Sequence, residues 1–455
     1  MFVCYGLSSI EFFLILIYNN SEIIYSLYYD IRDDQLPIVY SPHYNVSFGG
    51  FERCHVFDVK KWRNVVNFLK AANFLTDEQL VKPREPKKSD LLIVHTKKYL
   101  KSLKWSVVVA IVTEVPIVAC VPNVLVQKAI LKPMRYQTGG SVLAGKLALE
   151  RGWAINIGGG FHHCCASKGG GFCPYADITL LVRCLMNEGM VRTAMIVDLD
   201  AHQGNGHERD FLHVREVYIL DMYNRSIYPR DCVAKRAIRK KVELKSRVDD
   251  LEYLLKLRYA LREAFEEFTP DIVVYNAGTD ILYPDPLGGM FISEHGIIKR
   301  DEIVFKHCKD RNIPIVMLTS GGYLRKTARI IANSIMNLEE KQLINIHHQS
   351  VTKTNLIKEI YNENKDNRKV TKSITLADKS DKEIKKNSQD QAKPCPNIQN
   401  EDENIPDSKK KKENTNKITL AEFLNESAIL CSENEIGPSL EFRNKVSSKS
   451  GPIST

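Results

Sequence analysis

A series of short, continuously apolar runs marks this chain up to residue 319. The runs are rich in β-branched residues and do not alternate polar with apolar side chains, which is typical of parallel strands buried on both faces. They lie at residues 37–40, 91–95, 154–157, 194–199, 217–221, 272–275 and 315–319. Helical patterns occur between them, at 59–72, 139–151 and 251–268. The sequence therefore predicts an α/β fold with a central, mostly parallel sheet flanked by helices.

The predicted sheet belongs to a domain at 37–338. Residues 1–36 form an N-terminal extension of uncertain structure. The apolar stretch Ile10–Ile17 within it is too short for a membrane span, which needs roughly 20 residues. We therefore expect no transmembrane segment.

The composition changes after residue 338, where Lys, Asn, Glu, Ser and Asp dominate. Such a segment buries too little apolar surface to offset the entropy of ordering, so 339–455 is predicted to be a disordered polar tail. Within it, 418–430 could form a docking motif for partner proteins. The run Lys409–Lys412 is either a nuclear-import signal or a solvated charge run.

The charge and the cysteine content argue against a sequence-specific nucleic-acid-binding protein and against a disulfide-stabilised scaffold. The net charge of +9 is dispersed over the chain, so we expect no direct sequence-specific contact with nucleic acid. The eleven cysteines contain no CxxC pair. This usage favours a reduced, intracellular setting over a disulfide-stabilised scaffold.

Candidate metal ligands follow two of the apolar runs. Asp200 and His202 stand two residues apart after 194–197, and Asp280 follows 273–275. In doubly wound sheets the functional site lies beyond the carboxyl ends of the strands, where these side chains meet. Two carboxylates and one imidazole form an open site of the kind that Zn²⁺ uses in catalysis. The pattern indicates metal-assisted hydrolysis.

Histidines and a further carboxylate surround these ligands. Gly158–Gly160 precede His162 and His163, and glycines let the backbone turn tightly beside a ligand. One histidine can take a proton from an attacking water, and one can protonate a leaving amine. Asp198 either holds one of them or caps its strand.

Two aromatic residues follow glycines in the same way. Tyr323 follows Ser320–Gly322, where its phenol could donate to the oxyanion of a tetrahedral intermediate, although such a tyrosine is often only a packed aromatic. Phe172 follows Gly169–Gly171 and could wall an extended apolar substrate site.

In this order along the chain, the motifs resemble those of the zinc-dependent histone deacetylases. They are GGGFHH, GGGFC, DLDAHQGNGHE, NAGTD and TSGGY, beginning at residues 158, 169, 198, 276 and 319. The resemblance covers about 37–338. Within the family the chain looks like the class IV, histone deacetylase eleven-like type, through the stretches 154–164, 198–211 and 273–282.

The resemblance implies an arginase–deacetylase fold and a zinc enzyme. Asp200, His202 and Asp280 would bind Zn²⁺, although Fe²⁺ suits the same mixed ligands. Backbone carbonyls of 198–202 would bind a structural K⁺.

The resemblance also implies catalytic roles. His163 would act as general base and then general acid beside His162, and Asp198 would accept a hydrogen bond from His162. Tyr323 would polarise the substrate carbonyl. Asn205 stands where many family members have an aspartate paired with the second histidine. A neutral partner stabilises imidazolium less, so the basicity of His163 should differ.

Further residues would form the substrate channel. Phe172 and Tyr228 would line it, and Gly160 would lie near the scissile amide. Residues 44–51 would form the entrance loop. Arg230 stands where a glycine is commoner, which puts the conformation of the loop beside the channel in question.

Class IV resemblance implies removal of long fatty-acyl groups from lysine in preference to acetyl. The expected substrates are acyl-lysine proteins, histones among them, with roles in chromatin regulation and transcriptional repression, in nucleus and cytoplasm. Two alternatives stay open: an amidohydrolase of the same fold acting on acylpolyamines, and a non-catalytic scaffold.

Overall fold

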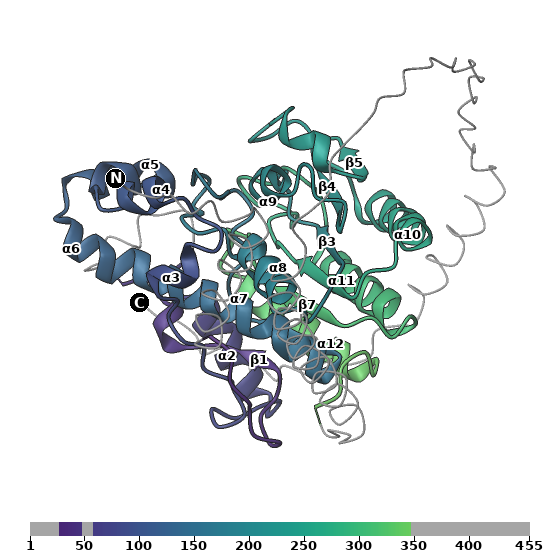
Figure 1. The fold of residues 1–455 in the computed structure, drawn as a ribbon. Coiled ribbons are helices and arrows are strands. Elements are labelled where there is room, and N and C mark those ends of the chain that lie inside the picture. The colour runs from purple at the N-terminus through teal and green to yellow at the C-terminus, as the bar shows by residue number, and fades with distance from the viewer. Residues whose placement is uncertain (1–26, 48–57, 347–455) are drawn as a thin grey trace, which may run out of the picture. The chain divides into compact units, whose positions relative to one another are not determined.

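The computed structural model describes residues 27–47 and 58–346, and in them seven strands form one sheet (Figure 1). The strand order is β1-β2-β7-β6-β3-β4-β5, and every neighbouring pair is parallel. The strands are β1 (Ile38–Val39), β2 (Trp153–Asn156), β3 (Ala194–Asp198), β4 (Val217–Asn224), β5 (Lys240–Leu244), β6 (Ile272–Asn276) and β7 (Ile315–Leu318). The predicted central parallel sheet is confirmed.

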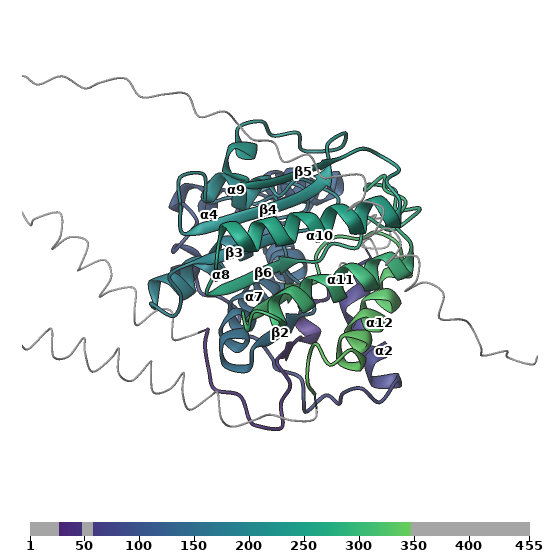
Figure 2. The same ribbon diagram turned by 90° about the vertical axis from the view of Figure 1, so that its right-hand side faces the viewer.

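Helices cover both faces of the sheet. One face carries α2 (Lys61–Ala71), α10 (Asp250–Glu267), α11 (Glu294–Lys309) and α12 (Thr327–Glu340), of which α10 to α12 lie in front of the sheet in Figure 2. The other carries α7 (Lys132–Arg151) and α8 (Asp177–Asn187), with α3 (Lys88–Leu91), α4 (Lys97–Ser102), α5 (Ser106–Thr113) and α6 (Asn123–Val126) beside them.

Successive residues of each strand enter different cores. Met195 and Val197 pack with the α10 to α12 layer, whereas Ala194 and Ile196 pack with α7 and α8. Both faces of β3 are therefore buried in apolar cores, which explains why its residues do not alternate between polar and apolar.

The prediction of a strand at 91–95 was wrong. Residues Lys88–Leu91 form the short helix α3, in which the Asp90 carboxylate accepts the Lys87 N–H at 2.7 Å. The next residues form a turn, closed by the His95 N–H and the Leu91 carbonyl at 2.8 Å. Local capping thus outweighs the strand propensity of Ile93 and Val94.

Strand β5 was not predicted, because its sequence contains charged residues and no continuous apolar run. Lys240–Leu244 lies at the sheet edge, where the first four side chains alternate between half-buried and exposed and Leu244 is buried. Charged side chains are common on such edges because they discourage pairing with other chains. The helix predicted at 139–151 begins earlier, at Lys132.

Packing extends toward the N-terminus. Leu27 and Tyr28, which fall within the predicted extension, are buried in the same core as α7 and α8. The division into extension, domain and tail stays a prediction, because 1–26 and 347–455 lie outside the described residues. In the described part, no helix has the length and apolar character to cross a bilayer.

Close packing between α7 and β2 positions the site loops. The Tyr44 hydroxyl donates a hydrogen bond to the Asn156 side chain at 2.7 Å. Gly140 lies against this pair, and a Cβ on Gly140 would overlap the Tyr44 hydroxyl. Any side chain at residue 140 must therefore displace this buried hydrogen bond.

We expect Gly140→Ala to lower the free energy of unfolding by about 1–3 kcal/mol, because overpacking outweighs the gain in helix propensity. Urea unfolding of the two proteins measures the difference. An unchanged or more stable variant would contradict the packing described above.

Candidate active site

Three side chains meet beyond the carboxyl ends of β3 and β6. His202 Nδ1 lies 2.8 Å from Asp280 Oδ2 and 3.2 Å from Asp200 Oδ1. Their ligand atoms all lie within 4.8 Å of one another, and the three residues are buried. The structure thus brings together the set that the sequence predicted as metal ligands.

Neighbouring glycines make room for these carboxylates. A Cβ on Gly278 or on Gly321 would overlap the Asp200 carboxylate, so both turns require the absence of a side chain. The Ala201 N–H donates to Asp280 Oδ1 at 2.9 Å and fixes that carboxylate from the β3 side. The triad is therefore built by backbone that approaches it closely.

The electrostatics of the triad fit a divalent cation. Burial and the charge of Asp200 raise the pKa of Asp280 to about 7. Burial lowers the pKa of His202, but hydrogen bonds and charge from Asp200 and Asp280 outweigh it and raise the pKa to about 10. A cation held by all three would balance two buried carboxylates, and Asp₂His is a donor set that leaves a coordination position open.

The tandem histidines have different partners. His162 Nδ1 lies 2.9 Å from Asp198 Oδ2, and His163 Nδ1 lies 2.8 Å from Asn205 Oδ1. Their ring centroids are 4.1 Å apart. Asn205 Nδ2 faces Asp231 at 3.4 Å, which orients the amide oxygen toward His163. The His163 proton therefore lies on Nδ1, and Nε2 is left as a base.

Burial and nearby charges separate the pKa values of the two histidines. Burial lowers the pKa of His162, but Asp198 and Asp200 outweigh it and raise the pKa to about 9. Burial, and then the charges of His162 and His202, lower the pKa of His163 well below its usual range. One histidine is thus cationic and its neighbour neutral near pH 7, an arrangement suited to acid–base catalysis.

Asp198 has more partners than the sequence indicated. Besides His162, it accepts from the Asn276 side chain at 2.9 Å and contacts His207 Nε2 at 2.8 Å. His207 is buried on α9 (Asn205–Asp210). Sequence reasoning missed it, because its distance from Asp198 depends on how the turn before α9 folds back.

Asp177 is a second residue that sequence reasoning missed. Its carboxylate accepts the N–H groups of Gly160 at 2.8 Å and Phe161 at 2.7 Å. Gly158, Gly159 and Gly160 have φ of 149°, 74° and 76°, which few other residues adopt. Asp177, in the first turn of α8, thereby positions the loop that carries both histidines.

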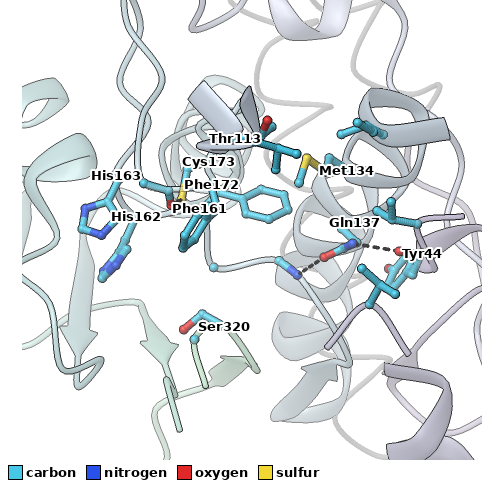
Figure 3. A pocket seen from close by; sticks show the side chains of 18 of the residues that line it. Tyr44, Thr113, Met134, Gln137, Phe161, His162, His163, Phe172, Cys173 and Ser320 are labelled. Atoms are coloured by element: carbon cyan, nitrogen blue, oxygen red, sulfur yellow. Dashed lines mark hydrogen bonds between the residues drawn. The ribbon is translucent and has the colours of Figure 1, made fainter. Parts of the chain in front are cut away.

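A cavity of about 140 Å³ begins at the catalytic side chains and continues between apolar ones. His162, His163, Asp200 and Tyr323 line one end. Figure 3 shows the histidines at one end, with Met134, Thr113 and Tyr44 away from them and Phe161 and Phe172 between. The cavity is also lined by Tyr44, Val46, Val59, Trp62, Thr113, Val115, Ile117, Val118, Ile130 and Met134.

The predicted channel residues lie around this cavity. Gly160 and Phe172 line it, and the Phe172 ring lies edge-on to Tyr323 with centroids 6.0 Å apart. Tyr228 is half-exposed and lies edge-on to His163 with centroids 4.9 Å apart, outside the cavity lining. Burial raises the pKa of Tyr323 well above its usual range, so its phenol keeps its proton.

Loops at the predicted entrance are described only in part. Residues 48–51 of the expected entrance loop lie outside the described residues, whereas Tyr44 is buried against Asn156. Arg230 has φ of 53° and donates to the Ser226 carbonyl. The backbone of Arg230 thus adopts the left-handed conformation that glycine adopts more readily.

Lys61, at the start of α2, is the third residue that sequence reasoning missed. Its Nζ donates to the Ser320 carbonyl at 2.8 Å and to that of Gly321. The side chain is fully buried, and burial lowers its pKa to about 8. Lys61 thus holds the turn that carries Tyr323. Its sequence context carries no signal, because it resembles any lysine in the first turn of a surface helix.

Comparison with known proteins identifies the family. Residues 55–338 match the family described as histone deacetylase domain. The chain belongs to the histone deacetylase family. Histone deacetylases are hydrolases that act on the amide bond of acetyl-lysine, so the predicted enzyme class is confirmed.

Comparisons with individual proteins agree with the family assignment. The chain is 54% identical to histone deacetylase 2 of Arabidopsis thaliana over 318 residues, which cover 70% of this chain and 82% of that protein. It is 27% identical to the acetoin utilization protein AcuC of Staphylococcus aureus, over 60% of this chain and 74% of that protein. The crystal structure of the HDA15 HD domain matches with a TM-score of 0.56 at 18% identity, covering 71% of this chain and 94% of that one. That likeness confirms the fold class.

We expect Lys61→Met to lower kcat by about 10- to 100-fold with a smaller change in KM, because Tyr323 would lose its position relative to the substrate carbonyl. Steady-state kinetics on an acyl-lysine peptide measure the effect, with thermal unfolding to verify the fold. Lys60→Met, at the exposed neighbouring residue, is the matched control. A folded Lys61→Met enzyme with wild-type kcat would contradict this role.

We expect Asn205→Asp to move the acid limb of the kcat/KM profile to higher pH. A carboxylate beside His163 Nδ1 favours imidazolium and raises the pKa of His163, so a higher pH is needed to keep the base neutral. A pH–rate series measures the shift, with Asn312→Asp in an exposed turn as the control. A limb that stays in place, or moves to lower pH, would contradict the assignment of His163 as base.

Proposed function

We propose that this chain is a zinc-dependent lysine deacylase of class IV type that removes long fatty-acyl groups in preference to acetyl. The observation that carries the proposal is the continuity of the cavity, which leads from His163 and Tyr323 to a wall of apolar side chains. An acetyl group would leave that wall uncovered. Each further methylene that a substrate buries contributes about 0.8 kcal/mol.

Asp200, His202 and Asp280 would hold the zinc ion. When bound, zinc supplies Lewis acidity at the acyl carbonyl and lowers the pKa of a coordinated water. The donor chemistry, the burial and the raised pKa of Asp280 described above all support a divalent cation at this position.

The chain's own residues would move the protons. His163 Nε2 removes a proton from the attacking water, and the same nitrogen then protonates the lysine amine as the amide C–N bond breaks. The Tyr323 hydroxyl donates to the acyl oxygen, which carries negative charge in the tetrahedral intermediate. His162, with a pKa of about 9 beside Asp198, stays cationic and stabilises that charge. The products are a carboxylate and a free lysine.

A structural K⁺ near residues 198–202 is part of the same proposal. Asp221 supports it, because its Oδ1 is buried and has no hydrogen-bond partner among the described residues. Burial and the charges of Asp198 and Glu208 raise the pKa of Asp221 well above its usual range. A monovalent cation there would relieve this accumulation of negative charge.

Class IV type is supported by Asn205, which contacts His163 in place of the aspartate found in many family members. The proposed substrates are acyl-lysine proteins, histones among them. The proposed location is the nucleus and cytoplasm, where the chain would act in chromatin regulation and transcriptional repression.

The first experiment compares acetyl-lysine and myristoyl-lysine in one peptide sequence. We expect kcat/KM for myristoyl to exceed that for acetyl by at least about tenfold, because the longer chain covers the apolar wall. Chelation should abolish both activities and zinc should restore them. His163→Ala should lower both by roughly 10²- to 10⁴-fold, while His213→Ala, at an exposed histidine, should not.

Met134→Trp tests whether the cavity holds the acyl chain. The larger side chain would fill the end distant from the histidines, so myristoyl turnover should fall by roughly tenfold while acetyl turnover changes little. Preference for acetyl in the wild-type enzyme would overturn the acyl-length proposal but not the mechanism. Failure to hydrolyse either peptide with metal bound would overturn the deacylase proposal.

A further inference from the structure

Large apolar side chains are exposed together on one segment of the fold. This segment, the 97–128 lobe, comprises α4, α5, the 3₁₀ turn Pro116–Cys120 and α6. Trp105 and Ile111 are each 70% exposed and Val124 is 78% exposed. Val107, Ile117 and Leu125 are also exposed. Soluble proteins rarely expose so many large apolar side chains on one short segment unless it binds something.

The exposed side chains are not part of a loosely packed core. Tyr99, Leu103, Val109, Val118 and Val126 anchor the lobe in the same core as α7 and α8. The lobe therefore has a packed inner face and a separate apolar outer face. Figure 1 shows α4, α5 and α6 on the side of the fold away from α10.

The charge of the lobe identifies the kind of partner. Lys97, Lys98, Lys101, Lys104 and Lys128 are all exposed, and Glu114 is the only acidic residue between 97 and 128. Protein–protein interfaces are depleted in lysine. Lysine beside exposed tryptophan and aliphatic side chains is instead typical of segments that lie in the headgroup region of an anionic membrane.

We propose that the 97–128 lobe docks on the surface of an anionic phospholipid bilayer. Trp105, Ile111 and Val124 enter the headgroup region, and the lysines contact lipid phosphates and carboxylates. Ile117 connects this surface to the active site, because it is exposed and also lines the apolar cavity. The enzyme would thereby meet acyl chains of membrane-anchored substrates beside its cavity. This last link rests on the proposed function, whereas membrane binding does not.

The chain contains its own reporter for this contact. Of its three tryptophans, Trp62 and Trp153 are buried, whereas Trp105 is exposed. Vesicles of phosphatidylcholine with about one third phosphatidylserine should shift the tryptophan emission of the full chain to shorter wavelength. Brominated lipid should quench it. Both changes should disappear in Trp105→Phe and should be absent with phosphatidylcholine alone.

Sedimentation with the same vesicles measures the affinity. Ile111→Ser with Val124→Ser should weaken binding roughly tenfold, as should Lys101→Glu with Lys104→Glu. Leu251→Ser with Lys245→Glu makes the same kinds of change at an exposed residue of α10 and at an exposed lysine directly after β5, and should not weaken binding. Hydrolysis of a soluble acyl-lysine peptide should be unchanged in all of these variants, which separates a failure of docking from a failure of the proposed activity.

Four outcomes would overturn the proposal. In the first, the full chain stays in solution when the vesicles sediment, and in the second, both lobe variants bind as tightly as the wild type. A Trp105 emission that is already at short wavelength and insensitive to vesicles would show that another part of the chain, such as residues 1–26, covers the lobe. An emission shift that follows protein concentration would assign the surface to a second copy of the chain.

Discussion

The register between β3 and β6 is the constraint on which the active site depends. Asp198 stands opposite Asn276 in the parallel ladder, and the Leu199 N–H extends the ladder to the Asn276 carbonyl at 3.0 Å. Both strands therefore end at the same level, and Asp200 and Asp280 emerge at one point. A slip of one residue would turn the strand's side chains to the opposite face and separate these carboxylates.

Buried charge is then divided between positions with different tasks. Burial and the charge of Asp200 raise the pKa of Asp280, whereas Asp198 contacts His162, His207 and Asn276. The same contrast separates the tandem histidines. A carboxylate partner keeps His162 charged, whereas burial and the charges of His162 and His202 keep His163 neutral. Adjacent residues of one type thus acquire opposite protonation states from their surroundings alone.

Residues on other elements of the fold hold the loops of the site in place. Asp177 holds the glycine loop from α8, and Lys61 holds the Tyr323 turn from α2. The 97–128 lobe contributes Thr113, Val115 and Ile117 to the cavity wall while exposing an apolar outer face. The proposed acyl-chain selection and the proposed membrane contact therefore involve different residues of one segment.

The sequence by itself determined six of the seven described strands and placed the Asp200, His202 and Asp280 triad and the histidine pair after them. These features depend on short-range patterns: continuous apolar runs for buried strands, and polar residues directly after them for the site. It could not determine β5, whose edge position leaves no apolar run, or the turn at 91–95, where capping by Asp90 decides the conformation. Lys61, Asp177 and His207 acquire their roles only through the tertiary structure. The carbonyls that Lys61 contacts lie 259 and 260 residues away in the chain. The partners of Asp177 and His207 are 16, 17 and 9 residues away, and the intervening turns bring them together in a way that no local pattern encodes.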